Sequence, residues 1–380
     1  MSHTIMTYYY PGFHANKLMY PGLPNNWCEW ELVKKAQPYF DDHYQPRIPV
    51  WGYKMETEIE SMSLKLRTAK QFGLDSFIFL SYWFDEQEVC EKPLEIALAI
   101  ADESCVKPCI MWANHDRSYT FPEDGTYAPH RYLRVDYSPK ACKAMVALWV
   151  EKYFSNPNYF RLPDGKLFFG IYSPEAILAN TGSPDFLHAL INYIRETVRL
   201  QISSDIHIHG CQTRFINDLS ILSVGFDSCS DYVALGYSEN GREPSIDLPL
   251  LYGHLIVQIP EHELLANISE MYRTLNYIAP VPYYPVVTVG RDCSPRVLRY
   301  QTVRRGYYSS RPILREFGAS HLSARCKIAK SFLRVNHHPE NIIFICGWNE
   351  WTEGAYLEPD QRHGYTLLET IYTEFTRPWV

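Results

Sequence analysis

The chain has 380 residues, of which 46% are hydrophobic, and it carries a formal net charge of -7. This length and composition are those of a globular protein with either one elaborated barrel or two smaller domains. The negative charge provides no basic field for phosphates, so we expect neither nucleic acid nor an anionic membrane surface as a partner. The 29 Tyr and 9 Trp suit the C–H faces and hydroxyls of sugars.

The N-terminal residues show no cationic segment followed by a long apolar one, so we predict no signal peptide. No run of about 20 apolar residues occurs, which predicts that no helix spans a membrane. The ten cysteines are scattered without a Cys-x-x-Cys pair. We therefore expect reduced core cysteines in a cytoplasmic protein, with neither disulfides nor a zinc site.

Strand-like runs follow one another along the chain, and most are nearly continuous in apolar residues. Such runs are typical of a parallel sheet that is covered on both faces. The predicted strands are Ile5–Tyr10, Ser76–Trp83, Pro108–Ala113, Leu167–Tyr172, Asp205–Cys211, Phe226–Val233, Pro285–Val289 and Ile342–Cys346.

Helix-compatible stretches alternate with these strands. They are Glu56–Phe72, Pro93–Glu103, Pro139–Tyr153, Asp185–Leu200, Glu261–Tyr277, Ser320–Val335 and Tyr365–Phe375. The link Gln212–Val224 is too short for a helix to be predicted, so we expect the barrel to be irregular there. Alternation of strands and helices in this number predicts an α/β fold, a (β/α)8 TIM barrel that forms a single domain over residues 1–380.

Long polar segments that contain Pro and Gly follow several of the strands. They are Pro11–Tyr53, Asn114–Arg134, Gly236–Pro260 and Arg291–Phe317. Because each follows a strand, each is expected at the C-terminal face of the barrel, where enzymes of this architecture keep their chemistry.

The last predicted strand is followed by two glutamates, Glu350 and Glu353, with Trp348 and Trp351 beside them. Two carboxyl groups three residues apart therefore leave the core together and are partly shielded from water. In such a setting one carboxyl keeps its proton near neutral pH while the other stays ionised. Acid and base work on a glycosidic bond requires that difference. The first turn of a helix would explain the same acidic spacing structurally.

Short motifs along almost the whole chain resemble the WbsX-type proteins, a group with a domain similar to family-99 glycoside hydrolases. The block Trp348-Asn-Glu-Trp-Thr-Glu-Gly354, followed by Pro359, is the most specific of them. The others, in order, are Tyr8-Tyr-Tyr-Pro-Gly-Phe-His14, Cys28-Glu-Trp30, Ala36-Gln-Pro38, His43-Tyr-Gln-Pro46, Phe72-Gly-Leu-Asp75, Tyr82-Trp-Phe84, Glu91-Lys-Pro-Leu94, Trp112-Ala-Asn114, Gly290-Arg-Asp292 and Pro295-Arg296.

The resemblance implies a (β/α)8 barrel that acts on α-linked, mannoside-like or bacterial surface sugars and retains the anomeric configuration. In that family one glutamate draws the proton from the 2-hydroxyl of the sugar, which attacks its own anomeric carbon, and the other protonates the leaving oxygen. The intermediate is a 1,2-anhydro sugar. By position we assign Glu353 as general acid/base and Glu350 as the residue that acts through the 2-hydroxyl.

Two positions depart from the pattern of the relatives. Ser81 stands where many of them place His before Tyr-Trp, and His115 stands where Glu commonly follows Trp-Ala-Asn. Both positions are expected at strand ends, so we expect the sugar subsites to differ from those of the relatives.

Further polar and aromatic residues near strand ends are candidates for contact with the sugar. Core packing, loop capping or an internal ion pair would explain each of them equally well. The candidates are Tyr9, His14, Trp30, Tyr82, Trp83, Trp112, Asn114, His115, Asp292, Arg296, Trp348, Asn349 and Glu358.

His207 and His209 alternate on a predicted strand, so their imidazoles point the same way and a metal-dependent hydrolase is a rival interpretation. We favour hydrogen-bonded histidines inside the barrel, and we predict no metal and no cofactor. Phosphate-cradling glycine motifs and a Gly-x-Ser-x-Gly elbow are absent from the sequence. A glycan-processing hydrolase is thus the first hypothesis. A glycosyltransferase of surface-polysaccharide synthesis and a non-catalytic glycan-binding barrel are the alternatives.

Overall fold

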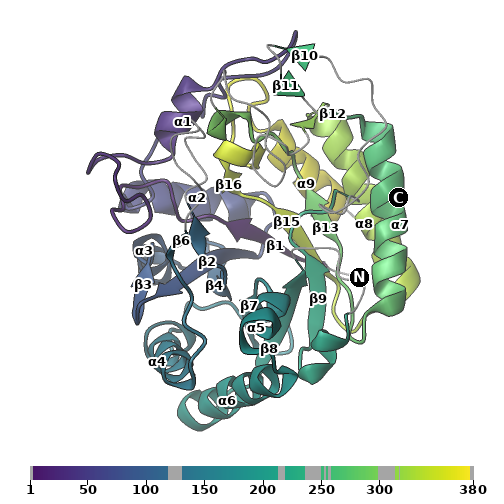
Figure 1. The fold of residues 1–380 in the computed structure, drawn as a ribbon. Coiled ribbons are helices and arrows are strands. Elements are labelled where there is room, and N and C mark those ends of the chain that lie inside the picture. The colour runs from purple at the N-terminus through teal and green to yellow at the C-terminus, as the bar shows by residue number, and fades with distance from the viewer. Residues whose placement is uncertain are drawn as a thin grey trace.

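The parallel strands of the described residues form a nearly closed barrel with helices outside it (Figure 1). The computed structural model describes residues 3–118, 131–212, 219–235, 250–251, 254–255, 258–297, 313–315 and 317–376. Within these residues the order of neighbouring strands is β13-β15-β1-β2-β4-β7-β8-β9. Their bounds are β1 Thr4–Tyr9, β2 Ser76–Phe84, β4 Lys107–Trp112, β7 Leu167–Ile171, β8 Ile206–Gln212, β9 Ser228–Asp231, β13 Val286–Thr288 and β15 Ile342–Cys346.

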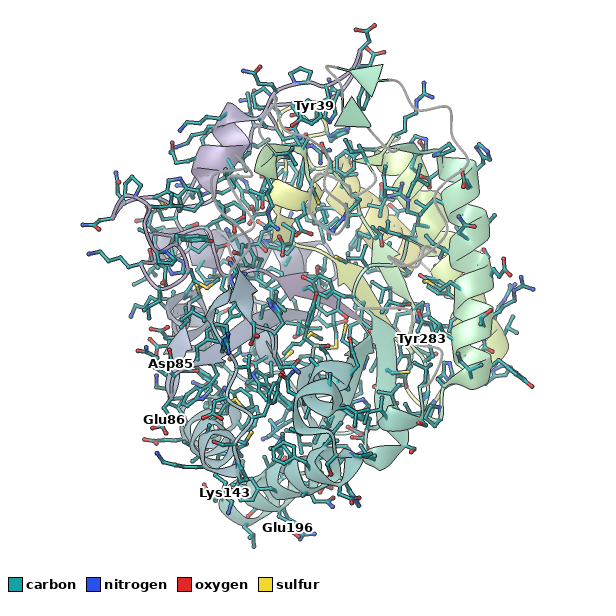
Figure 2. All side chains as sticks on the ribbon, in the orientation of Figure 1. Tyr39, Asp85, Glu86, Lys143, Glu196 and Tyr283 are labelled. Atoms are coloured by element: carbon teal, nitrogen blue, oxygen red, sulfur yellow. The ribbon has the colours of Figure 1, made fainter. Side chains whose placement is uncertain are left out.

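The barrel closes between β9 and β13 through a short contact instead of a full ladder. Cys229 forms an isolated parallel bridge with Tyr283, and the backbone N–H of Tyr284 donates to the Cys229 carbonyl at 2.8 Å. Tyr283 lies beside β9 in Figure 2. All eight predicted strands are confirmed, and the predicted (β/α)8 architecture is correct.

Each predicted helix corresponds to an observed helix. The helices are α1 Trp30–Lys35, α2 Ile59–Gln71, α3 Lys92–Ile100, α4 Pro139–Trp149, α5 Pro174–Thr181, α6 Pro184–Ile202, α7 Glu261–Ile278, α8 Ala319–Asn336 and α9 Thr366–Thr376. α4 continues as a π-helix, Val150–Phe154, and 3-10 turns occur at Ser220–Val224, Ser294–Arg296 and Trp351–Glu353. The sequence interpretation missed α1 and α5, because six and eight residues are too few to display a helical apolar stripe.

Further short strands are present besides the barrel strands. They are β3 Gln87–Val89, β5 Arg117–Ser118, β6 Arg131–Leu133, β10 Leu250–Leu251, β11 His254–Leu255, β12 Gln258–Ile259, β14 Ile313–Leu314, β16 Asn349–Glu350 and β17 Ala355–Tyr356. β3 pairs back on β2 through the two-residue turn Asp85–Glu86, whose φ angles of 49° and 59° match the right-handed twist of a hairpin. Much of the predicted long loops, namely 119–130, 236–249 and 298–312, lies outside the described residues.

The barrel interior is aromatic and holds the two alternating histidines of β8. The ring of Phe344 on β15 lies 5.9 Å from that of Tyr8, 6.0 Å from Phe168 and 4.5 Å from His209. His207 and His209 share the Ser228 hydroxyl, at 2.7 and 2.9 Å. These histidines are therefore hydrogen-bonded interior residues, as the sequence favoured. Within the described ranges, no group of three His, Cys, Asp or Glu side chains has a metal-binding arrangement.

All ten cysteines are buried and none is paired in a disulfide, so their predicted place in the core is confirmed. Within the described part of the chain, none of the helices has the length and apolar character needed to cross a bilayer.

Replacing Phe344 with Ala is expected to lower the free energy of unfolding by about 3–5 kcal/mol, because it opens a cavity where the interior rings meet. Phe344 is 0% exposed, whereas Tyr277 at the end of α7 is 90% exposed and serves as the control. Tyr277→Ala should change stability by less than about 0.5 kcal/mol. Urea unfolding followed by fluorescence measures both changes, and equal effects would contradict the described interior.

Candidate active site

A tight loop after β15 brings the two glutamates of the sequence motif together at the C-terminal end of the barrel. β16 and β17 pair antiparallel, and the 3-10 turn Trp351–Glu353 lies between them. Gly354 ends this turn at a φ of 67°, and a Cβ there would lie 2.7 Å from the Cβ of Asp292. Only glycine fits this contact without strain, so the turn is held against the loop that follows β13.

Glu353 lies between two arginines that come from the loop after β13. Its Oε2 accepts a hydrogen bond from Arg291 and its Oε1 accepts one from Arg296. All three side chains are almost completely buried. Two guanidinium partners in a water-poor setting stabilise the charged form, so Glu353 is the ionised member of the pair.

Glu350 has a different environment, although it is only three residues away. Its Oε2 finds no hydrogen-bond partner within the described residues, and Arg296 approaches it only to 3.8 Å. Burial, followed by the negative charge of Glu353, raises the pKa of Glu350 from 4.5 to about 8, against the opposing charge of Arg296. Glu350 is therefore the protonated member of the pair near neutral pH.

These environments favour the opposite division from the one that the sequence interpretation assigned, and the roles of the two residues stay a prediction. That interpretation gave the exchangeable acid proton to Glu353, and the spacing of the two residues could not reveal which one meets the arginines. Arg296 was among the predicted site residues, but Arg291 was not. The only sequence signal for Arg291 was its place in the motif Gly290-Arg-Asp292, directly before Asp292.

Aromatic rings from four strand ends surround the mouth of the barrel near Glu350. His115, after β4, lies 6.0 Å from the ring of Tyr82 and 5.4 Å from that of Tyr172. Tyr172 in turn lies 5.0 Å from Tyr232. Burial is the largest cause that raises the pKa of Tyr82 and of Tyr232, and the charge of Glu350 raises both pKa values further. Tyr82 and His115 were predicted as sugar contacts, whereas Tyr172 and Tyr232 were missed because they end strands without a polar motif.

His115 is neutral in this wall. Burial, followed by the charge of Arg117, lowers its pKa to about 4. Its ring is therefore a hydrogen-bonding group and not a cation at neutral pH, which suits an uncharged sugar.

Asp292 is engaged by the loop that follows β1, and its predicted contact with sugar stays a prediction. Its Oδ2 accepts from His43 at 3.0 Å, Gln45 at 2.7 Å and Arg47 at 3.2 Å. Burial alone would raise the pKa of Asp292, but the His43 hydrogen bond and the Arg47 charge outweigh it and hold the pKa well below its ordinary value. Since the backbone N–H of Asp292 donates to the Glu353 carbonyl at 2.6 Å, this cluster fixes the acidic turn.

Asn349 and Glu358 are also engaged inside the protein. The Asn349 amide exchanges two hydrogen bonds with the backbone of Tyr10, at 2.8 and 2.7 Å, and also donates to Glu56. Glu358 accepts from Trp351 Nε1 at 2.7 Å and pairs with Lys65 at 2.8 Å. These residues tie the loop to β1 and α2, and their predicted contact with sugar stays a prediction.

Most of the other predicted sugar contacts are buried away from solvent. The side-chain amide of Asn114 donates to the Ser173 carbonyl at 2.7 Å and accepts from the Ser173 backbone N–H at 2.8 Å. Burial lowers the pKa of His14 to about 4, so it is uncharged at neutral pH. The predicted residues that pack in the core are Tyr9, Trp30, Trp83, Trp112 and Trp348.

A family model described as Glycosyltransferase WbsX matches residues 5–371. The chain belongs to the WbsX family. An uncharacterized protein WxcX from Xanthomonas campestris pv. campestris is 28% identical over 381 residues, which cover 98% of this chain and 50% of that protein. The chain thus spans about half the length of the curated relatives it matches.

Solved structures with the same barrel include glycoside hydrolases. One, a glycoside hydrolase-like protein, has a TM-score of 0.62 at 16% identity and covers 98% of this chain and 94% of its own. Another, the GH99 endo-alpha-mannosidase from Bacteroides thetaiotaomicron, has a TM-score of 0.58 at 16% identity, with 98% and 97% covered. At this identity the similarity shows that the WbsX-family chain has the fold of these proteins.

The carboxyl of Glu350 is expected to titrate with a midpoint of about 8. Infrared difference spectroscopy of the protein without substrate should show the protonated carboxyl at pH 6 and its loss at higher pH, and the Glu350→Gln variant should lack this band change. A midpoint near the ordinary value of 4.5 would contradict the described burial.

The same shift makes stability depend on pH. Because the pKa of Glu350 is raised from 4.5 to about 8, the folded protein keeps a proton that the unfolded chain releases, and stability falls as the pH rises between these values. Glu350→Gln cannot ionise, so its urea midpoint should fall less than that of the parent between the two ends of this window. An equal fall in both proteins would show that other groups cause the dependence.

Proposed function

We propose that the chain is a retaining glycoside hydrolase that acts on α-linked sugars. The observation that carries this proposal is the pair of buried carboxyls at the barrel mouth. No described residue hydrogen-bonds Oε2 of Glu350, whereas Glu353 is held by two arginines. Acid and base roles need two carboxyls whose environments separate their proton affinities. The barrel fold shared with the glycoside hydrolases adds support.

In the proposed reaction Glu350 starts protonated and donates its proton to the glycosidic oxygen as the bond from that oxygen to the anomeric carbon breaks. Glu353, ionised, takes the proton of the sugar 2-hydroxyl, whose oxygen closes onto the anomeric carbon to give a 1,2-anhydro sugar. Glu350 then takes a proton from water, the water oxygen opens the strained ring at that carbon, and Glu353 returns its proton to the 2-oxygen. Two inversions at one carbon retain the configuration.

Arg296 serves both carboxyls in this sequence. It donates to Glu353 and lies 3.8 Å from Glu350, so it faces each residue at the moment when that residue carries the negative charge. A fixed cation that meets developing charge without rearrangement lowers the barrier of both steps.

The aromatic wall suits the ring of a neutral sugar. The rings of Tyr82, His115, Tyr172 and Tyr232 contact one another in a row, and the two end members, Tyr82 and Tyr232, interact with the charge of Glu350. Endo-alpha-mannosidase activity belongs by title to a protein of the same fold, so an α-mannoside-like unit or a bacterial surface polysaccharide is the substrate class we propose.

A glycosyltransferase is the second candidate, because the matching family model carries that description. A transferase would pass the same sugar from an activated donor to an acceptor and would release no free sugar without the donor. Incubation with α-linked oligosaccharides and polysaccharide fragments, followed by NMR of the first anomer, separates the two. Hydrolysis predicts an α-anomer from the glycan alone.

Glu350→Gln is expected to lower turnover of such glycans by about 100-fold or more, because the leaving oxygen loses its proton donor. The loss should be much smaller with an aryl or fluoride leaving group, which departs without a proton. Glu353→Gln should be impaired on both kinds of substrate. Steady-state kinetics on matched pairs of substrates measures the difference.

Glu103→Gln is the matched control, since this carboxyl is fully exposed and should leave turnover unchanged. The opposite pattern, with Glu353→Gln rescued by the good leaving group, would restore the assignment from the sequence. Full activity in both variants would refute the acid pair, and sugar binding without cleavage would favour the glycan-binding barrel.

A further inference from the structure

Glu29 is a third carboxylate buried behind the acid pair. It directly precedes α1, which packs against both the 3-10 turn of Arg296 and the turn of Glu353, and α1 lies near β16 in Figure 1. Glu29 is 0% exposed. A completely buried carboxylate is stable only when its oxygens accept hydrogen bonds or pair with cations.

Four donors engage the two oxygens of Glu29. Oε1 accepts from the hydroxyls of Tyr10 at 2.6 Å and Tyr20 at 3.1 Å. Oε2 accepts from Arg296 Nη2 at 3.0 Å and from the Thr352 hydroxyl at 2.5 Å. A carboxylate has about four lone-pair directions, so this one is saturated and rigid.

Glu29, Thr352 and Arg296 form a closed ring of hydrogen bonds. The Thr352 hydroxyl that donates to Glu29 accepts from Arg296 Nε at 2.9 Å. Thr352 is the residue directly before Glu353, so the ring fixes both the backbone of the acidic turn and the plane of the guanidinium. The remaining Nη1 of Arg296 then points at Glu353.

We propose that Glu29 is a positioning residue of the reaction: it locks Arg296 between the two catalytic carboxyls and keeps the proton on Glu350 until the sugar arrives. The part of this inference that concerns turnover, the positioning of Arg296 for the reaction, rests on the proposed function. Its electrostatic part concerns the protein without substrate.

The charges around Glu350 explain how Glu29 would keep the proton on Glu350. Glu353 and Glu29 face it as anions, while Arg296 and Arg291 face it as cations. These four charges sum to zero, so removing the charge of Glu29 leaves a net positive surrounding that favours ionised Glu350. Among the described residues, further titratable groups whose charges interact with Glu350 are Tyr82 on β2, Tyr232 after β9 and Cys346 on β15; burial is the main cause that raises the pKa of each.

Glu29→Gln, made in the full chain, tests both parts. The infrared titration of Glu350 should move to lower pH, the basic limb of the pH–rate profile should move with it, and kcat should fall about 10-fold or more with little change in KM, because substrate contacts are untouched. A titration midpoint and a pH profile identical to those of the parent would overturn the inference, even if kcat fell.

Two further variants separate position from charge. Glu103→Gln makes the same chemical change at a fully exposed carboxyl and should leave the midpoint and kcat near those of the parent. Glu29→Asp keeps the charge but is one methylene shorter, so we expect the midpoint to stay and kcat to fall. Full kcat in Glu29→Asp would overturn the positioning role, and this variant remains informative if Glu29→Gln does not fold.

The infrared titration of Glu350 needs no substrate. A failure of the proposed function can therefore be told apart from a failure of the role proposed for Glu29. If no glycan is cleaved, the proposed function fails, while the response of Glu350 to Glu29→Gln still supports or overturns the electrostatic part. If glycans are cleaved with an unchanged pH profile in Glu29→Gln, the hydrolase stands and the role of Glu29 falls.

Discussion

A carboxylate that leaves water must find its counter-charge in the protein, and the whole C-terminal end of this barrel is organised by that requirement. Glu29 and Glu353 meet it through Arg296, with Arg291 as a second partner of Glu353. Glu350 does not meet it, since no described donor bonds its Oε2, and it therefore keeps its proton. Burial and the unequal sharing of the cations thus favour the proton on Glu350 over Glu353, although the two side chains are chemically identical.

The acidic turn is too short to hold itself, so distant parts of the chain hold it. On one side Asp292 gathers His43, Gln45 and Arg47 and binds the Glu353 carbonyl through its own N–H. On the other side lies a second buried network, built from Glu56, Lys65, Asn349, Trp351 and Glu358. Both networks combine charges with many directed hydrogen bonds, which fix one geometry more sharply than apolar packing does.

The strands were predictable because a parallel sheet covered on both faces needs continuous apolar runs, and Ile342–Cys346 supplies one just before the acid pair. The site itself was predictable only in part. Glu29 bonds Arg296 across 267 residues of sequence, and no local pattern encodes such a meeting. The internal contacts of Asn349 and Glu358 could not be predicted either, because a polar residue in such a motif has the same appearance whether it binds a ligand or holds the loop.

The separation between residues that hold the acid pair and residues that line the mouth has a consequence for specificity. The holding residues, such as Asp292 and Asn349, are completely buried, and a change there disturbs the chemistry for any sugar. Tyr82, His115, Tyr172 and Tyr232 stand at strand ends around the pair and carry none of its hydrogen bonds described here. The departure from the family pattern at His115 falls in this second group. In the proposed hydrolase a new sugar subsite can therefore arise without moving the two carboxyls, because the wall and the acid pair are supported by different contacts.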